Sequence, residues 1–235
     1  MNATNQHPNY YKFKDHLKII LNNLPNRTFE NYIKEVVKYC NENFSPDKIE
    51  ESGDYYIFDE CNYVETFMTV DHKTIELYNW DKLSHDIQNK FKGDTFEYFA
   101  KHFVTYFSSD IKFGMSDYKF INDSNDLGVD AIANLTANNG KAFIQVKFRS
   151  SYEGTAIDKD NFCSLGFISE LQHNYDKNNN SHRLVIIISN DYEKGVSLNA
   201  QKLINLVNHI IIDKGIIQYH INNNPDFFNK LIESL

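Results

Sequence analysis

Two short apolar runs in the last third of the chain constrain its fold most. They are RLVIIIS at residues 183–189 and HIIID at 209–213. Each run is short for a core helix and rich in β-branched residues, which is typical of a strand buried on both faces. Such strands need helices above and below them. We therefore expect an α/β fold with a mixed central sheet flanked by helices.

The first 80 residues follow another pattern and predict a small α+β unit. Apolar residues have helical spacing in FKDHLKIILNNL and FENYIKEVVKYC. After Pro46, the stretches DYYIF, NYVETFMTV and TIELYN predict short strands. We expect a domain boundary near Trp80, with an N-terminal unit over 1–80 and the α/β domain over 81–235. The N-terminal unit has no readable motif, so target recognition, dimerisation and partner docking all stay open for it.

Composition narrows the class of protein. The hydrophobic fraction of 41% is enough for a core, and the net charge is −8. Neither half of the chain has the basic excess of a protein that coats nucleic acid, whereas a metal enzyme uses carboxylates in its site. No apolar run approaches the ~20 residues that span a bilayer, and the first residues lack a signal-peptide core. We expect a soluble, cytoplasmic protein without a membrane partner.

The cysteines indicate neither a disulfide framework nor a zinc site. Cys40, Cys61 and Cys163 are odd in number and far apart in the sequence. We interpret them as ordinary buried thiols.

The second part begins with a helix and a hairpin. A helix is expected at about 95–107, with Glu97 at the edge of an apolar stripe formed by Phe96, Phe99, Ala100, Phe103 and Phe107. Strands are expected at 128–135 and 141–148. They are joined through Asn138-Asn139-Gly140, and Asn-Gly is a strong hairpin signal because both residues tolerate positive φ.

Three polar residues interrupt these two strands. Gln145 and Lys147 share one face of the second strand because side chains alternate, and antiparallel pairing allows Asp130 to lie close to both. Burying polar groups without partners costs about 2–7 kcal/mol each. One interpretation is a structural Asp130–Lys147 ion pair, which is a weak source of stability. The other is a metal site, because carboxylate and amide oxygens suit Mg²⁺ or Mn²⁺.

A family resemblance favours the metal site. The run DLGVD at 126–130, followed by FIQVK at 143–147, resembles the PD-(D/E)XK nuclease superfamily, and within it the Mrr-type restriction endonucleases. That branch has a Q-x-K strand in place of (D/E)-x-K. GDTFEYFA at 93–100 is similar to the opening helix of the branch. The resemblance covers about residues 91–213 and implies a restriction-endonuclease-like core.

The resemblance implies a role for each matching residue. Asp130 corresponds to the central metal ligand, Glu97 to a helix acid that completes the metal shell, and Lys147 to the catalytic lysine. Gln145 takes the place of the usual second acid, and the backbone carbonyl of Val146 is a further ligand. Because an amide has no charge, Gln145 leaves open whether one or two ions bind. Asp126 is either a turn residue or a second acid near the site.

The implied activity is metal-dependent hydrolysis of DNA phosphodiester bonds, with Mg²⁺ or Mn²⁺ as cofactor. We expect an endonuclease of restriction or defence type, acting alone, as a homodimer, or as the nuclease module of a larger helicase-containing protein. The alternative is a non-catalytic module that keeps this fold and binds DNA or a partner. Arg149, Ser150 and Ser151 are either phosphate contacts or part of a solvated loop.

Overall fold

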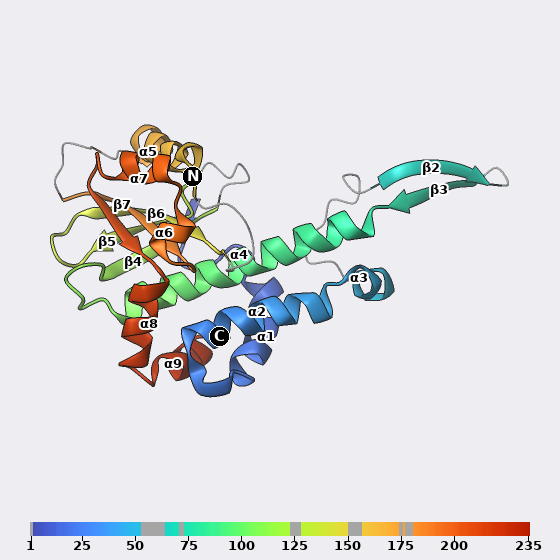
Figure 1. Ribbon diagram of the computed structural model, residues 1–235, viewed down its shortest axis with the longest axis horizontal. Helices are drawn as coiled ribbons and strands as arrows, with labels where there is room; N and C mark the ends of the chain where they lie inside the picture. Colours follow the sequence, from blue (N-terminus) through green and yellow to red (C-terminus); the bar gives the residue numbers. More distant parts are fainter. Residues whose placement is uncertain are drawn as a thin grey trace.

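The computed structural model describes residues 2–52, 64–70, 73–122, 128–149, 157–173, 176 and 181–235. Its centre is a mixed sheet with the strand order β1-β4-β5-β6-β7-β8 (Figure 1). The strands β4 to β6 are antiparallel, β6 to β8 are parallel, and the three-residue β1 adds an antiparallel edge. Their bounds are Asn2–Thr4 (β1), Met115–Asn122 (β4), Ala131–Leu135 (β5), Lys141–Lys147 (β6), Arg183–Ile188 (β7) and His209–Ile212 (β8).

The apolar run at 183–189 contains the inner parallel strand β7. All of its residues from Leu184 to Ile188 are buried. Ile187 belongs to the apolar cluster on one face of the sheet, and Ile186 belongs to the cluster on the other face. The predicted mixed sheet with helices on both faces is confirmed.

The predicted hairpin is formed by β5 and β6. Its register pairs Ala131 with Ile144 and Asn134 with Lys141. Asn139 has a φ of 55°, in the left-handed region, whereas Gly140 has no positive φ, so the Asn-Gly signal marks the hairpin but not a turn with both residues left-handed. In β6, even-numbered residues such as Ile144 face one apolar cluster, and Phe143 faces the other.

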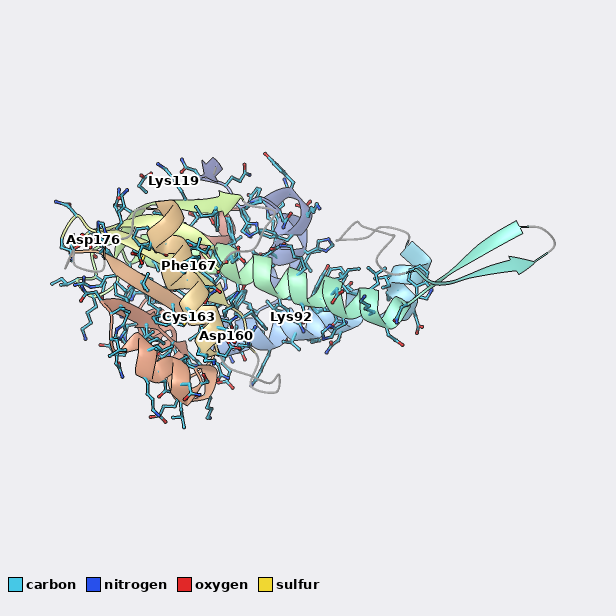
Figure 2. The ribbon with its side chains drawn as sticks, turned by 90° about the horizontal axis from the view of Figure 1, so that it is seen from above. Lys92, Lys119, Asp160, Cys163, Phe167 and Asp176 are labelled. Atoms are coloured by element: carbon cyan, nitrogen blue, oxygen red, sulfur yellow. The ribbon has the colours of Figure 1, made fainter. Side chains whose placement is uncertain are left out.

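The helix expected at 95–107 is the second half of a longer helix, α4 (Trp80–Tyr106), which begins after the cap Asn79. It covers one face of the sheet, and α8 (Lys214–Asn222) and α9 (Phe227–Glu233) belong to the same apolar cluster, with α9 packed on α4. The other face is covered by α5 (Lys159–His173) and α7 (Leu198–Ile204), next to the short α6 (Tyr192–Gly195). Figure 2 shows α5, with Asp160, Cys163 and Phe167 labelled, lying across the sheet.

The N-terminal helices pack on α4. They are α1 (Tyr10–Asn22), the short 3-10 helix η1 (Pro25–Arg27), α2 (Phe29–Asn43) and α3 (Pro46–Ser52). The ring centroids of Tyr32 and Phe99 lie 4.8 Å apart, and both rings belong to one apolar cluster that also includes sheet residues. This cluster crosses the boundary predicted near residue 80. Whether the two parts also fold as separate units stays a prediction.

The strands predicted around 62–79 form a separate two-stranded sheet. It consists of β2 (Val64–Val70) and β3 (Lys73–Tyr78), which pair antiparallel. Figure 1 shows this hairpin beyond the N-terminal end of α4, away from the large sheet. The stretch DYYIF at 54–58 lies outside the described residues. Among the helices that are described, none has the length and apolar character needed to cross a bilayer.

Candidate functional site

Asp130 lies at the start of β5, between two neighbouring strands. Its backbone N–H donates to the Ile144 carbonyl at 2.8 Å, and its carbonyl accepts from the Ile121 N–H at 2.9 Å. Its side-chain Oδ2 accepts from the Val146 N–H at 2.5 Å. The N–H and C=O of one strand residue point to the same side, so the Val146 carbonyl is also directed toward Asp130. The structure thus brings Asp130 against Val146, the central residue of Gln145-Val146-Lys147.

Gln145 is buried, with only 1% of its surface exposed, and its amide is held in one orientation. Its Nε2 donates to the Gly128 carbonyl at 3.1 Å. Its Oε1 is buried and has no hydrogen-bond partner within the described part of the chain. Leaving a buried acceptor without a partner costs about 1–3 kcal/mol. A ligand that offers a positive charge or a proton to Oε1 would recover this cost.

Gln145 and Lys147 line the same cavity on the α5 side of β6. The cavity has a volume of about 210 Å³ and is closed on one side by α5, where Phe167 is 61% exposed. Within the described ranges, the Lys147 amine makes no ion pair or hydrogen bond. The lining residues are Gly128, Gln145, Lys147, Asn161, Ser164, Phe167 and Ile168.

Glu97 approaches from the opposite face of the sheet. It lies on α4, and its side chain is 24% exposed. The neighbouring Phe96 ring lies 5.9 Å from the ring of Phe148, which follows Lys147, so Glu97 is level with the end of β6. In the part of the chain that is described, no hydrogen bond or ion pair joins Glu97 to Lys147; Glu97 bonds to His7 instead, at 3.0 Å.

Tyr118 on β4 connects the two predicted acids. Its hydroxyl is buried and has no partner among the residues described. Burial raises the pKa of Tyr118 well above its usual value, and the negative charges of Glu97 and Asp130 raise this pKa further. The charges of both carboxylates therefore act on the same hydroxyl, although no hydrogen bond or ion pair joins Glu97 to Asp130 among the described residues.

Sequence reasoning missed His7, Asp94 and Tyr118. His7 and Asp94 are almost completely buried beside Glu97. The only signal for Asp94 was its i, i+3 spacing from Glu97, which puts both acids on one side of the helix. His7 precedes the first helix, and no periodic pattern includes it.

The remaining candidate residues from the sequence either have contacts or positions that give them no part in this group, or lie outside the described residues. The Arg149 backbone and the Ser189 hydroxyl exchange two hydrogen bonds, of 2.6 and 2.7 Å. Cys40 is buried as expected, whereas Cys163 is exposed on α5. The residues outside the described ranges are Cys61, Asp126, Ser150 and Ser151.

The predicted ligands are of the chemical kind that a hard divalent cation prefers, but Asp130 and Glu97 are not among the residues that line the cavity beside Gln145 and Lys147. Asp130 and Glu97 supply carboxylates, Gln145 supplies a buried amide oxygen that lacks a partner, and Val146 supplies a carbonyl on the Asp130 side of β6. Oxygen ligands of this kind are the ones that Mg²⁺ and Mn²⁺ prefer.

No family model, curated protein or solved structure matches this chain. The resemblance to Mrr-type nucleases therefore rests on the three sequence motifs alone.

Proposed function

We propose that the chain is a metal-dependent DNA endonuclease that hydrolyses phosphodiester bonds. The observation that carries the proposal is the Gln145 amide. Its Nε2 is bound to Gly128, so its buried Oε1 is left as an acceptor beside the Lys147 cavity. A purely structural glutamine at this position would satisfy both ends of its amide.

The proposed metal ligands are Asp130, Glu97, the Gln145 amide oxygen and the Val146 carbonyl. Mg²⁺ or Mn²⁺ held there would supply Lewis acidity for the phosphate oxygens and for water. The Val146 N–H bond fixes the Asp130 carboxylate against β6, so that its orientation does not depend on a bound ion.

Lys147 is the proposed catalytic cation. Lys147 is half-buried and lines the cavity, and its amine has no ion-pair partner in the described ranges, so it is available to a substrate phosphate or to the attacking water. Orienting that water and easing its proton transfer is worth about 10²–10⁴-fold in rate. The absence of a partner also disfavours the interpretation of Lys147 as half of a structural ion pair.

The fold, the location in the cell and the biological setting of the chain belong to the same proposal. A mixed sheet with helices on both faces is compatible with a restriction-endonuclease-like core. We extend the proposal to a cytoplasmic protein of restriction or defence type, or to the nuclease module of a helicase-containing protein. Association as a homodimer fits either setting.

Plasmid cleavage tests the proposal. Supercoiled plasmid is incubated with the full chain and Mg²⁺ or Mn²⁺, and EDTA provides the control. We expect nicked or linear DNA only with the metal. DNA that is bound but left intact with both metals would instead support the non-catalytic binding module.

A further inference from the structure

Three ionisable side chains gather beside the proposed nuclease site. His7 Nε2 lies 3.0 Å from Glu97 Oε2 and 3.8 Å from Asp94 Oδ1. One ligand atom from each of the three residues lies within 4.8 Å of the other two, which is close enough for a shared metal ion. The hydrogen bonds around the group decide between a second metal site and another role.

The His7 ring is oriented as a hydrogen-bond donor to Glu97. The backbone N–H of Asn9 donates to His7 Nδ1 at 3.1 Å, so Nδ1 is the unprotonated nitrogen. A neutral ring then carries its proton on Nε2, the atom that faces Glu97. A metal ligand needs a lone pair on that atom, and its other nitrogen normally donates a proton. His7 has the opposite arrangement.

Asp94 is already paired. Its Oδ1 accepts from the Lys90 amine at 2.8 Å, and its Oδ2 accepts from the Asn9 side-chain amide at 2.9 Å. A cation bound to Oδ1 would be repelled by the Lys90 charge. The group is therefore a hydrogen-bonded network in which Asp94 anchors the N-terminal segment to α4.

Packing fixes the His7 ring in this place. The ring is 3% exposed and lies edge-on to Phe13 at 5.1 Å and to Phe120 at 4.9 Å. The preceding residues pair with the edge of the sheet, where Thr4 lies opposite Phe120. The His7 ring, whose Nε2–H is the donor to Glu97, is thus held from two sides, by α1 and by β4.

We propose that His7 is a positioning residue for Glu97, and that the N-terminal segment completes the nuclease site. This inference rests on the proposed function. The Nε2–H of His7 holds Glu97 Oε2, which leaves Oε1 as the ligand atom. Glu97 makes no other hydrogen bond within the described ranges, and a partly exposed glutamate without this bond would sample several rotamers. Outer partners of this kind typically change metal affinity by about 10–100-fold.

The His7–Glu97 bond is tested first without metal. The full chain is labelled with ¹⁵N-histidine, and His7 is assigned from the signals lost in His7→Gln. We expect the imidazole ¹⁵N shifts of the tautomer protonated on Nε2, and we expect these shifts to change in Glu97→Gln. A proton on Nδ1, or shifts unaffected by Glu97→Gln, would overturn the inference.

The second test is calorimetric titration of Mn²⁺ into the wild type and three variants. His7→Met keeps much of the side-chain volume but removes the donor, and we expect about tenfold weaker binding or more. His7→Gln keeps an N–H near the position of Nε2 and should recover most of the affinity. Asn9→Ala removes the parallel bond to Asp94 and should bind Mn²⁺ as the wild type does, because Glu97 is untouched.

The outcomes separate this inference from the proposed function. If His7→Met binds Mn²⁺ as tightly as the wild type, or if Asn9→Ala loses as much affinity as His7→Met, His7 has only a structural role and the nuclease proposal stands. If the wild type neither binds Mn²⁺ nor cuts plasmid, the proposed function fails. The tautomer measurement then still decides whether His7 holds Glu97.

Discussion

At the scale of single residues, a hydrogen bond gives a reason for an amide at position 145. Its Nε2 donates to the Gly128 carbonyl at 3.1 Å, and a carboxylate has no proton to give. The polar pattern of β6 was readable from the sequence because strand alternation alone puts Gln145 and Lys147 on one side. The Gly128 bond was not readable, because it depends on how the chain enters β5.

The first prediction concerns that amide. Gln145→Glu places a carboxylate oxygen against the Gly128 carbonyl, so we expect the free energy of unfolding to fall by about 1–3 kcal/mol at neutral pH. Unfolding in urea measures this loss of stability. Gln201→Glu is the matched control, because Gln201 donates to the Val196 carbonyl at 2.9 Å from a half-buried position on α7, and its loss should be smaller. A Gln145→Glu protein as stable as the wild type would contradict the proposed orientation of the amide.

The second prediction compares two glycines. Gly128 has a φ of +89°, and an added Cβ would lie 3.2 Å from Ser164 Cβ and 3.4 Å from Gln145 Nε2. Gly128→Ala should therefore cost about 1–3 kcal/mol of stability. Gly93 lies inside α4 with nothing within 4 Å of an added Cβ, so Gly93→Ala should stabilise by up to about 1 kcal/mol. If Gly128→Ala and Gly93→Ala change the melting temperature by the same amount, the turn at Gly128 is not strained.

At the scale of helices and strands, the sequence predicted which elements are present better than where each element begins and ends. The buried strands and the hairpin follow from residue periodicity, whereas α4 is longer than its apolar stripe because Gly93 does not interrupt it. Helix α8 was missed. Its N-cap Asp213 accepts from the Ile216 N–H, but only Ile217 and Ile221 are buried, too few for a clear helical pattern.

The contact between α4 and α9 carries the third prediction. His102 packs against the Phe227 ring, and burial, helped by the Lys101 charge, lowers the pKa of His102 from 6.5 to about 4. Because the unfolded chain takes up this proton between pH 6.5 and 4 and the folded chain does not, stability is lost as pH falls through this window. The loss is at most about 3 kcal/mol.

Unfolding measured between pH 7 and 4 checks this dependence. His102→Phe keeps a ring against Phe227 but cannot take up a proton, so its stability should fall less over the same window. His85→Asn, on the exposed side of α4, serves as the control. A His102→Phe protein with the pH dependence of the wild type would rule out His102 as the cause.

At the scale of the whole molecule, the N-terminal helices share a core with the sheet. The Phe29 and Tyr32 rings of α2 lie 5.2 and 4.8 Å from Phe99 of α4. The sequence could not reveal this sharing. Amphipathic patterns show that α1, α2 and α4 each bury one side, but they do not show against which partner.

The fourth prediction follows from the shared core. The fragment 81–235 produced alone would expose the side of α4 that α2 covers, and it would lack His7, so it should not unfold cooperatively as a monomer. Near-ultraviolet circular dichroism during a thermal melt measures this, with the full chain as reference. The division predicted near residue 80 gives the opposite result: a cooperative melt, and a stable proteolytic fragment that begins between Tyr78 and Lys92.

The nuclease account is tested most directly by the metal-dependent cleavage rate of folded Lys147→Ala protein. Lys141→Ala is the matched control, because Lys141 is the exposed lysine at the other end of the same strand. If Lys147 handles the attacking water, Lys147→Ala should melt close to the wild type and cut plasmid about 10²-fold more slowly, whereas Lys141→Ala should cut normally. A Lys147→Ala protein that cuts at the wild-type rate, or loses cleavage only in proportion to its unfolded fraction, would contradict the account.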